Sequence, residues 1–177
     1  GETYRQKGEY DKALADFDRA IELDPQYDWA ISRRGETYRQ KGEYDKALAD
    51  FDRAIELDQD NHWAYEQRGR VLSSLGRHDE AIRAFDEAER TGPNCFSCVA
   101  LRGEAYRQKD EYDKALADFD RAIELNPQYD WAISRRGETY RQKGEYDKAL
   151  ADFDRAIELD PQYDWAISRR GETYRQK

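Results

Sequence analysis

The chain has 177 residues and a formal net charge of −9, and charged residues make up 39% of it. This negative balance argues against non-specific binding to nucleic acid, because contacts with phosphates need a basic surface. No apolar run approaches the ~20 residues of a membrane span, and no basic segment followed by an apolar one indicates a signal peptide. We therefore expect a cytoplasmic protein that binds neither nucleic acid nor membrane.

Glycine recurs every 34 residues, and this period determines the expected architecture. Segment 1–41 is identical to segment 137–177. A unit of this length cannot bury its own apolar face, so each unit has to stack on the next. We expect a single all-α array over 1–177. Its units are 1–34, 35–68, 69–102, 103–136 and 137–170, followed by a partial helix at 171–177.

Each unit contributes to a pair of amphipathic helices. The pattern predicts one helix over Asp28–Lys41, a turn at Gly42, and a second helix from Tyr44 to about Leu57. Apolar residues of both helices recur at the i, i+3, i+4, i+7 spacing of one buried face. Prolines stand just past the second helix, where they prevent it from continuing. They are Pro25, Pro93, Pro127 and Pro161.

These residues resemble the tetratricopeptide repeat over essentially the whole chain. Its spacing is matched by Gly35, Tyr38, Gly42, Tyr44, Ala47, Phe51, Ala54 and the helix-ending proline. The resemblance implies an α-solenoid, in which antiparallel helix pairs stack into a right-handed superhelix. It also implies that the first helices line a concave groove, which typically holds a partner's peptide. Some members bind a chaperone's C-terminal carboxylate through a lysine–asparagine clamp, but Ser32 and Glu36 occupy those places here, so we do not predict that ligand.

A close helix contact and a row of arginines are expected to be structural. Gly35 and Ala47 can face each other only if the two helices approach closely, which a larger side chain would prevent. An arginine row lies on a mostly apolar helix face, so we expect the aliphatic stems to pack and each guanidinium to reach a carboxylate. The row consists of Arg34, Arg68, Arg102, Arg136 and Arg170.

The remaining residues of the first helices form a polar and aromatic stripe, which in a stacked array becomes the groove wall. The candidate groove residues are Trp29, Arg33, Glu36, Arg39, Trp63, Arg70, Arg107, Trp131, Arg135, Glu138, Arg141, Trp165 and Arg169. Segment 28–41 carries four basic and two acidic residues, whereas 42–58 carries two basic and six acidic ones. This segregation predicts a locally positive groove that favours acidic partners.

Three tryptophans precede an arginine by four residues, a spacing that allows the guanidinium to stack on the indole. They are Trp29, Trp131 and Trp165. A packing interpretation is the alternative: the tryptophans fill the seam between successive helix pairs, beside Tyr27, Tyr129 and Tyr163. In the same way, Arg33 and Glu36, or Glu36 and Arg39, can pair with each other and bind nothing.

The third repeat, from His62 to Cys95, keeps the core glycines and alanines but changes most surface positions. It either sets the register of a partner or is an older repeat that escaped duplication, and the sequence does not separate the two. In the fourth repeat, Asp110 stands where a turn glycine is expected.

Cys95 and Cys98 form a lone C-x-x-C at the start of the fourth unit's first helix. A redox or metal role there competes with simple packing, because Cys98 replaces a small core residue. Two cysteines do not make a disulfide framework, which favours a reducing compartment. No catalytic or phosphate-binding motif is present. We therefore expect a non-enzyme without metal or cofactor.

Two functions remain open. The first is a binding module whose groove takes an extended or helical peptide of acidic character. The second is a structural spacer or self-stacking rod, which would associate end to end. We further expect the chain to be a slice of a longer array, such as the sensor or recruiting region of a multidomain signalling protein, because both ends fall within a first helix.

Overall fold

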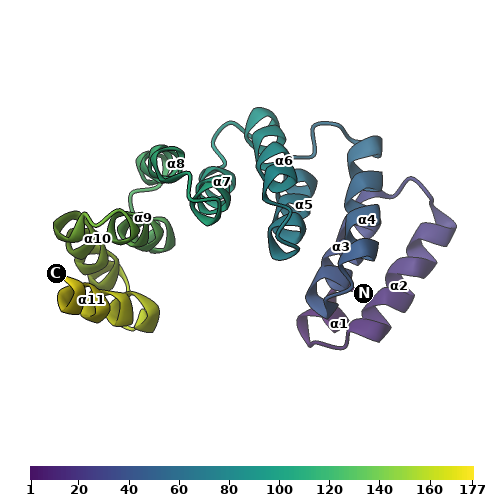
Figure 1. The fold of residues 1–177 in the computed structure, drawn as a ribbon. Helices are drawn as coiled ribbons and strands as arrows, with labels where there is room; N and C mark the ends of the chain where they lie inside the picture. The colour runs from purple at the N-terminus through teal and green to yellow at the C-terminus, as the bar shows by residue number, and fades with distance from the viewer. The chain divides into compact units, whose positions relative to one another are not determined.

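The computed structural model describes residues 1–177, and these form eleven helices and no strand (Figure 1). The fold is therefore all-α, as the periodicity predicts. The helices group into two compact units, Gly1–Pro93 and Asn94–Lys177. No helix combines the length and apolar character needed to cross a membrane. A single continuous array over 1–177 and its superhelical path remain predictions.

The first unit contains six helices. They are α1 (Glu2–Gln6), α2 (Tyr10–Leu23), α3 (Asp28–Lys41), α4 (Tyr44–Leu57), α5 (His62–Ser74) and α6 (His78–Thr91). The second unit contains five. They are α7 (Phe96–Gln108), α8 (Tyr112–Leu125), α9 (Asp130–Gln142), α10 (Tyr146–Leu159) and α11 (Asp164–Gln176). The predicted bounds of α3 and α4 are confirmed, and four of the five second helices end two residues before a proline.

The turn inside each pair depends on a residue whose backbone adopts the left-handed conformation. At Gly42 the backbone has φ of 77°, a conformation that costs glycine little. Asp110 adopts the same conformation, with φ of 58°, in the place of a glycine. Its carboxylate accepts a hydrogen bond from the Tyr112 hydroxyl at 2.7 Å, and short polar residues such as aspartate tolerate this region better than most.

The core of each unit is a row of second-helix phenylalanines packed against small residues of the first helices. These phenylalanines are 0–2% exposed, and they are Phe17, Phe51, Phe85, Phe119 and Phe153. A methyl group added at Gly35 would lie 3.0 Å from both Asp50 Cβ and Phe51 Cε1. The predicted close approach is confirmed, although the atoms that demand it belong to Phe51 and Asp50 rather than to the Ala47 side chain.

An arginine clamp ties three helices together in each unit. Arg34 of α3 donates two hydrogen bonds to Asp50 of α4, at 2.9 and 2.6 Å, and a third to Asp18 of α2 at 2.8 Å. These bonds, with Asp50 contributing most, raise the pKa of the Arg34 guanidinium and keep it charged. Arg136 of α9 repeats the arrangement with the equivalent carboxylates of α10 and α8, Asp152 and Asp120. The structural role predicted for this row is confirmed.

The third repeat has only half of the clamp. Arg68 donates to Asp52 of α4 at 2.6 Å. Ala84 of α6 stands one 34-residue period after Asp50, where the buried carboxylate would be. The clamp's ion pair between α5 and α6 is thus missing, whereas Phe85 still packs against Gly69 as Phe51 packs against Gly35.

The glycine contacts generate a first prediction, tested with two glycines in identical local sequence. Gly137→Ala brings the new methyl group to 3.0 Å from Asp152 Cβ and 3.2 Å from Phe153 Cε1. Overpacking of this kind costs about 1–3 kcal/mol, of which the better helix propensity of alanine offsets about 0.5–1. We expect unfolding free energy to fall by about 1–2 kcal/mol, measured by urea denaturation.

Gly171→Ala is the matched control. Its added methyl group meets no atom within 4 Å. This variant should be neutral or more stable by about 0.5–1 kcal/mol, through helix propensity alone. Equal destabilisation of the two variants would contradict the close-approach argument.

Candidate functional site

The tryptophans of the first helices sit in the seams between helix pairs. Trp131 of α9 meets Phe119 of α8 edge-on, with ring centroids 6.5 Å apart, and stacks on Tyr129 at 5.9 Å. Trp29 makes the same two contacts with Phe17 and Tyr27, at 6.0 and 5.8 Å. These are the contacts that the packing interpretation expects. The indoles are nevertheless not fully covered, and Trp29 remains 42% exposed.

Each unit contains one arginine held between two tryptophans, which we call the arginine–tryptophan sandwich. In the first unit the Arg33 guanidinium lies 5.8 Å from the Trp29 ring and 4.9 Å from the Trp63 ring. In the second unit Arg135 lies 5.4 Å from Trp131 and 4.1 Å from Trp165. The contact within one helix follows the predicted i, i+4 spacing.

The contact with the next helix is the closer of the two, and sequence reasoning missed it. The 34-residue period contained the signal for it, because Trp63 and Trp165 stand one repeat after Trp29 and Trp131. In a stack, first helices of successive units become neighbours. The pattern also explains why each unit has a single sandwich. Gln67 and Leu101 replace the arginine in the intervening repeats, and Ser97 replaces one tryptophan.

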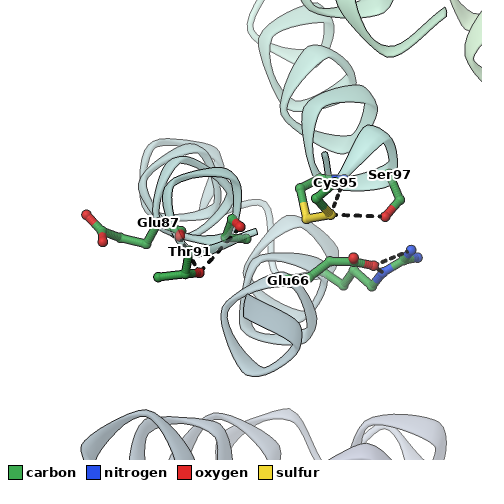
Figure 2. Close-up of a disulfide and its surroundings, with 8 residues drawn as sticks. Glu66, Glu87, Thr91, Cys95 and Ser97 are labelled. Carbon is green, nitrogen blue, oxygen red and sulfur yellow. Dashed lines mark hydrogen bonds and ion pairs between the residues drawn. A yellow bond between two sulfur atoms is a disulfide. The ribbon is translucent and has the colours of Figure 1, made fainter. Parts of the chain in front are cut away.

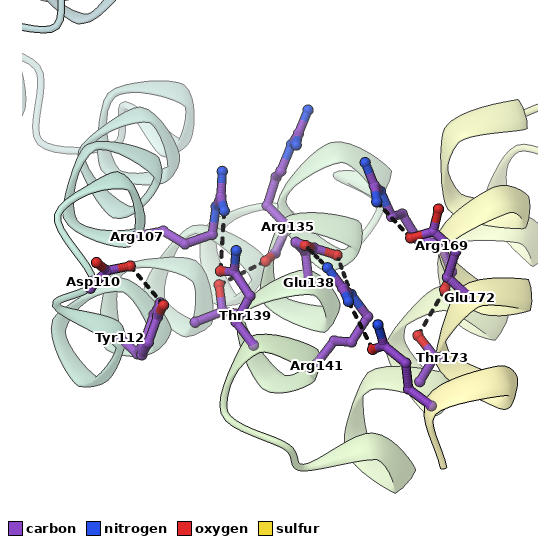
Figure 3. Close-up of polar contacts among 12 residues, drawn as sticks. Arg107, Asp110, Tyr112, Arg135, Glu138, Thr139, Arg141, Arg169, Glu172 and Thr173 are labelled. Carbon is purple, nitrogen blue, oxygen red and sulfur yellow. Dashed lines mark hydrogen bonds and ion pairs between the residues drawn. The ribbon is translucent and has the colours of Figure 1, made fainter.

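Most other cations of the candidate groove are neutralised by carboxylates of the same helix. Glu138 receives two hydrogen bonds from Arg141 (Figure 3). In the first unit, Glu36 receives two from Arg39, at 2.9 and 2.8 Å. The same kind of pair occurs at several other predicted groove positions. These pairs are Arg107 with Glu104, Arg70 with Glu66, and Arg169 with Glu172. The alternative of mutual pairing therefore describes this row.

The sandwiched arginines differ from the rest. No carboxylate lies within ion-pair distance of Arg33 or Arg135, and the buried Nε of Arg135 has no hydrogen-bond partner. Figure 3 shows Arg135 extending from α9 on the same side as Arg107 of α7 and Arg169 of α11. A guanidinium held between aromatic rings keeps N–H donors of the kind that pair with oxyanions.

The predicted positive surface is narrower than the count of charges suggests. Of the four basic residues in α3, Arg34 belongs to the clamp and Arg39 pairs with Glu36. Lys41 contacts Asp11 at 2.7 Å and Glu43 at 3.0 Å. Only Arg33 has no ion pair, and its charge also acts on the Glu2 carboxyl, whose pKa is lowered chiefly by Arg5. In α3 the positive charge without an ion pair is thus limited to the sandwiched arginine and does not extend along the helix.

The C-x-x-C pair forms a disulfide in the first turn of α7 (Figure 2). Cys95 is the N-cap, and its sulfur accepts a hydrogen bond from the Cys98 backbone N–H at 3.2 Å. Cys98 is fully buried, as its packing interpretation predicts. The disulfide links the N-cap residue to the first turn of α7. None of its atoms belongs to the arginine–tryptophan sandwiches.

The chain is similar to several known repeat proteins. The family described as "TPR repeat" matches residues 1–40 and 35–76, and families described as "Tetratricopeptide repeat" match residues 66–130 and 131–163. No curated protein sequence gives a significant match.

Solved structures give matches along most of the chain. A crystal structure of MamA is 25% identical, with 92% of this chain and 95% of that chain covered and a TM-score of 0.82. For TTC0263, a thermophilic TPR protein from Thermus thermophilus, the identity is 25%, the coverage 98% and 95%, and the TM-score 0.80. YrrB, described as a TPR protein with an unusual peptide-binding site, is 26% identical, with 96% of this chain and 88% of that chain covered and a TM-score of 0.77.

Two adjacent arginines of α9 supply the prediction for this site. Arg136→Met leaves the carboxylate of Asp152, whose side chain is 8% exposed, without its partner. Loss of one member of such a buried pair costs about 3–5 kcal/mol. Arg135→Met removes no ion pair, and a thioether keeps favourable contact with the two indoles, so its cost should stay below about 1 kcal/mol. Urea denaturation of the two variants measures both values.

The double variant Arg136→Met/Asp152→Ala provides the control, because it removes the orphaned carboxylate as well as the arginine. We expect it to recover a large part of the stability lost in Arg136→Met. If Arg135→Met proved as destabilising as Arg136→Met, Arg135 would have a structural role like that of Arg136.

Proposed function

Because this chain belongs to the tetratricopeptide repeat family, whose members generally serve as scaffolds for protein–protein interaction and are typically non-catalytic, we propose that it is a peptide-binding module. Its partner is an extended or helical protein segment of acidic character. A segment lies along the first helices of a unit, and its carboxylates engage the sandwiched arginine of that unit, Arg33 in the first and Arg135 in the second.

The observation that carries this proposal is the unpaired state of the two sandwiched arginines. In a chain with 39 acidic residues and 30 lysines and arginines, nearly every other cation of the first helices finds a carboxylate. Arg135 instead leaves a buried Nε without a hydrogen bond. An unmade hydrogen bond of a charged group costs folding free energy, so its presence supports a partner that supplies the missing acceptor.

The sandwich also suits binding on physical grounds. Indole rings on both faces of a guanidinium restrict its rotamers before binding, and they shield the charge from water, which strengthens its attraction to a carboxylate. Tryptophan and arginine are the side chains most often found at the energetic centres of protein interfaces. The printed description of YrrB, which names a peptide-binding site, adds support from a similar structure.

Charge on the second helices favours the same surface. Helix α4 and its flanking residues carry a strong excess of carboxylates, which repel an acidic segment from that side of each pair. The attraction and repulsion together would orient an acidic peptide toward the first helices. This steering falls with ionic strength, because salt screens exposed charges over about 8–10 Å under ordinary conditions.

The test is selection from a random peptide library, followed by measurement of the best peptide by calorimetry at low and high salt. We expect acidic peptides to be enriched and their affinity to fall with salt. The variant Arg33→Ala/Arg135→Ala should weaken binding about tenfold or more, since a hydrogen bond to a charged group contributes about 1.5–3 kcal/mol.

Arg53→Ala/Arg121→Ala is the control, because it also removes two positive charges, but from second helices, where both arginines are exposed. It should change affinity by less than about threefold, the effect of net charge alone. Enrichment of peptides that bind both double variants equally would refute the sandwich as the binding element. No enrichment at all, together with end-to-end association in sedimentation, would favour the spacer function.

A further inference from the structure

A hollow of about 180 Å³ opens beside the sandwich of the first unit, between α3 and α5. Its lining consists of Asp28, Trp29, Ser32, Arg33, Asn61 and Trp63. It is smaller than the ~300–1,000 Å³ of typical small-molecule sites, so it suits a single side chain rather than a whole ligand.

The second unit shows what occupies this space when it is filled. There Tyr163 precedes α11, and its ring lies 6.1 Å from the Trp165 ring. Its hydroxyl lies 3.1 Å from Ser134 Oγ of α9, which forms a hydrogen bond between neighbouring repeats. Ser134 also donates to the Trp131 carbonyl at 2.8 Å.

The hollow exists because Asn61 stands where the tyrosine should be. Asn61 precedes α5 as Tyr163 precedes α11, but its side chain folds back onto its own helix. The carbonyl oxygen accepts a hydrogen bond from the Ala64 backbone N–H at 3.0 Å and so caps the helix. A short, cap-forming side chain cannot reach across to α3, and the phenol site between the two helices is left open.

The open site is reflected in the hydrogen bonding of Ser32. Ser32 and Ser134 occupy the same position in helices of identical sequence. Ser32 is 5% exposed, yet its Oγ has no hydrogen-bond partner. A buried hydroxyl without a partner costs about 1–3 kcal/mol. It lies in the wall of the hollow, where the Tyr163 hydroxyl meets Ser134 in the other unit.

We propose that this hollow binds the side chain of a tyrosine in the partner peptide. The phenol ring packs against Trp63 as Tyr163 packs against Trp165, and its hydroxyl pairs with Ser32 Oγ. This inference rests on the proposed peptide-binding function and adds a residue-specific anchor to it. A carboxylate near the tyrosine in the partner then reaches Arg33, which lines the same hollow.

Other occupants fit less well. A phenylalanine fills the same volume but leaves Ser32 unpaired. A phosphate or a free carboxylate inside the hollow would face the carboxylate of Asp28 in addition to Arg33. The phenol is neutral, aromatic and carries one hydroxyl, which matches two indoles and one unpartnered serine.

The test uses N-acetyltyrosinamide, a neutral probe that carries the phenol and no acidic group. Titration is followed by the indole N–H resonances in ¹H–¹⁵N NMR spectra. We expect saturable shifts of Trp63, with those of Trp131 and Trp165 unchanged. N-acetylphenylalaninamide should bind about two- to tenfold more weakly, the effect of one neutral hydrogen bond.

Three variants make the assignment specific. Asn61→Tyr restores the tyrosine found at this position in other repeats, fills the hollow from within and should abolish the shifts. Ser32→Ala should keep binding but remove the difference between the two probes. Ser134→Ala is the matched control in the second unit and should leave both titrations unchanged. Circular dichroism checks that each variant is folded.

The outcomes separate this inference from the proposed function. Absence of Trp63 shifts up to the solubility of the probe, equal binding of both probes, or binding unaffected by Asn61→Tyr would each overturn the tyrosine site. None of these results would affect the library selection with Arg33→Ala/Arg135→Ala. Conversely, a selection without acidic peptides would leave the neutral-probe titration as an independent test of the hollow.

Discussion

The clamp between one arginine and two aspartates holds α3 and α9 against the second helices on either side. Arg34 reaches the second helix of its own pair through Asp50 and the preceding second helix through Asp18. A single side chain thereby fixes α3 against both α2 and α4. Neighbouring residues of a helix point about 100° apart, so orienting Arg34 into the seam turns Arg33 toward the tryptophans. The placement of the arginine–tryptophan sandwich therefore depends on a structural contact made one residue away.

Most of the fold could be predicted from the sequence because one period governs it. The 34-residue spacing, the i, i+3, i+4 faces and the prolines define where α3 and α4 begin and end. Close packing at Gly35 and the clamp of Arg34 also follow, since a small residue and a long cation on a buried face have few other uses. The contact of Trp63 with Arg33 could not be placed, because it depends on how successive helix pairs tilt.

The pairing of side chains within the stripe was the least predictable part of the site. Glu36 has an arginine three residues before it and another three residues after it, and sequence spacing gives no preference between Arg33 and Arg39. In the structure the Arg33 guanidinium is drawn to the indoles, so Glu36 pairs with Arg39. The charge count of the whole helix therefore overestimated the free positive charge. Competition between aromatic and carboxylate partners, rather than composition, decides which arginine stays available.

The third repeat shows that the function of a helix here is set by its neighbour. Helices α3 and α9 share the sequence DWAISRRGETYRQ, and both contain a sandwiched arginine. Yet Ser134 is satisfied by Tyr163 and Ser32 is not, because the following repeat supplies asparagine in one case and tyrosine in the other. A substitution outside α3 thus opens a hollow in its wall without changing any of its residues. An array of near-identical repeats can acquire distinct sites in this way, since each site is shared between two units and a change in either one alters it.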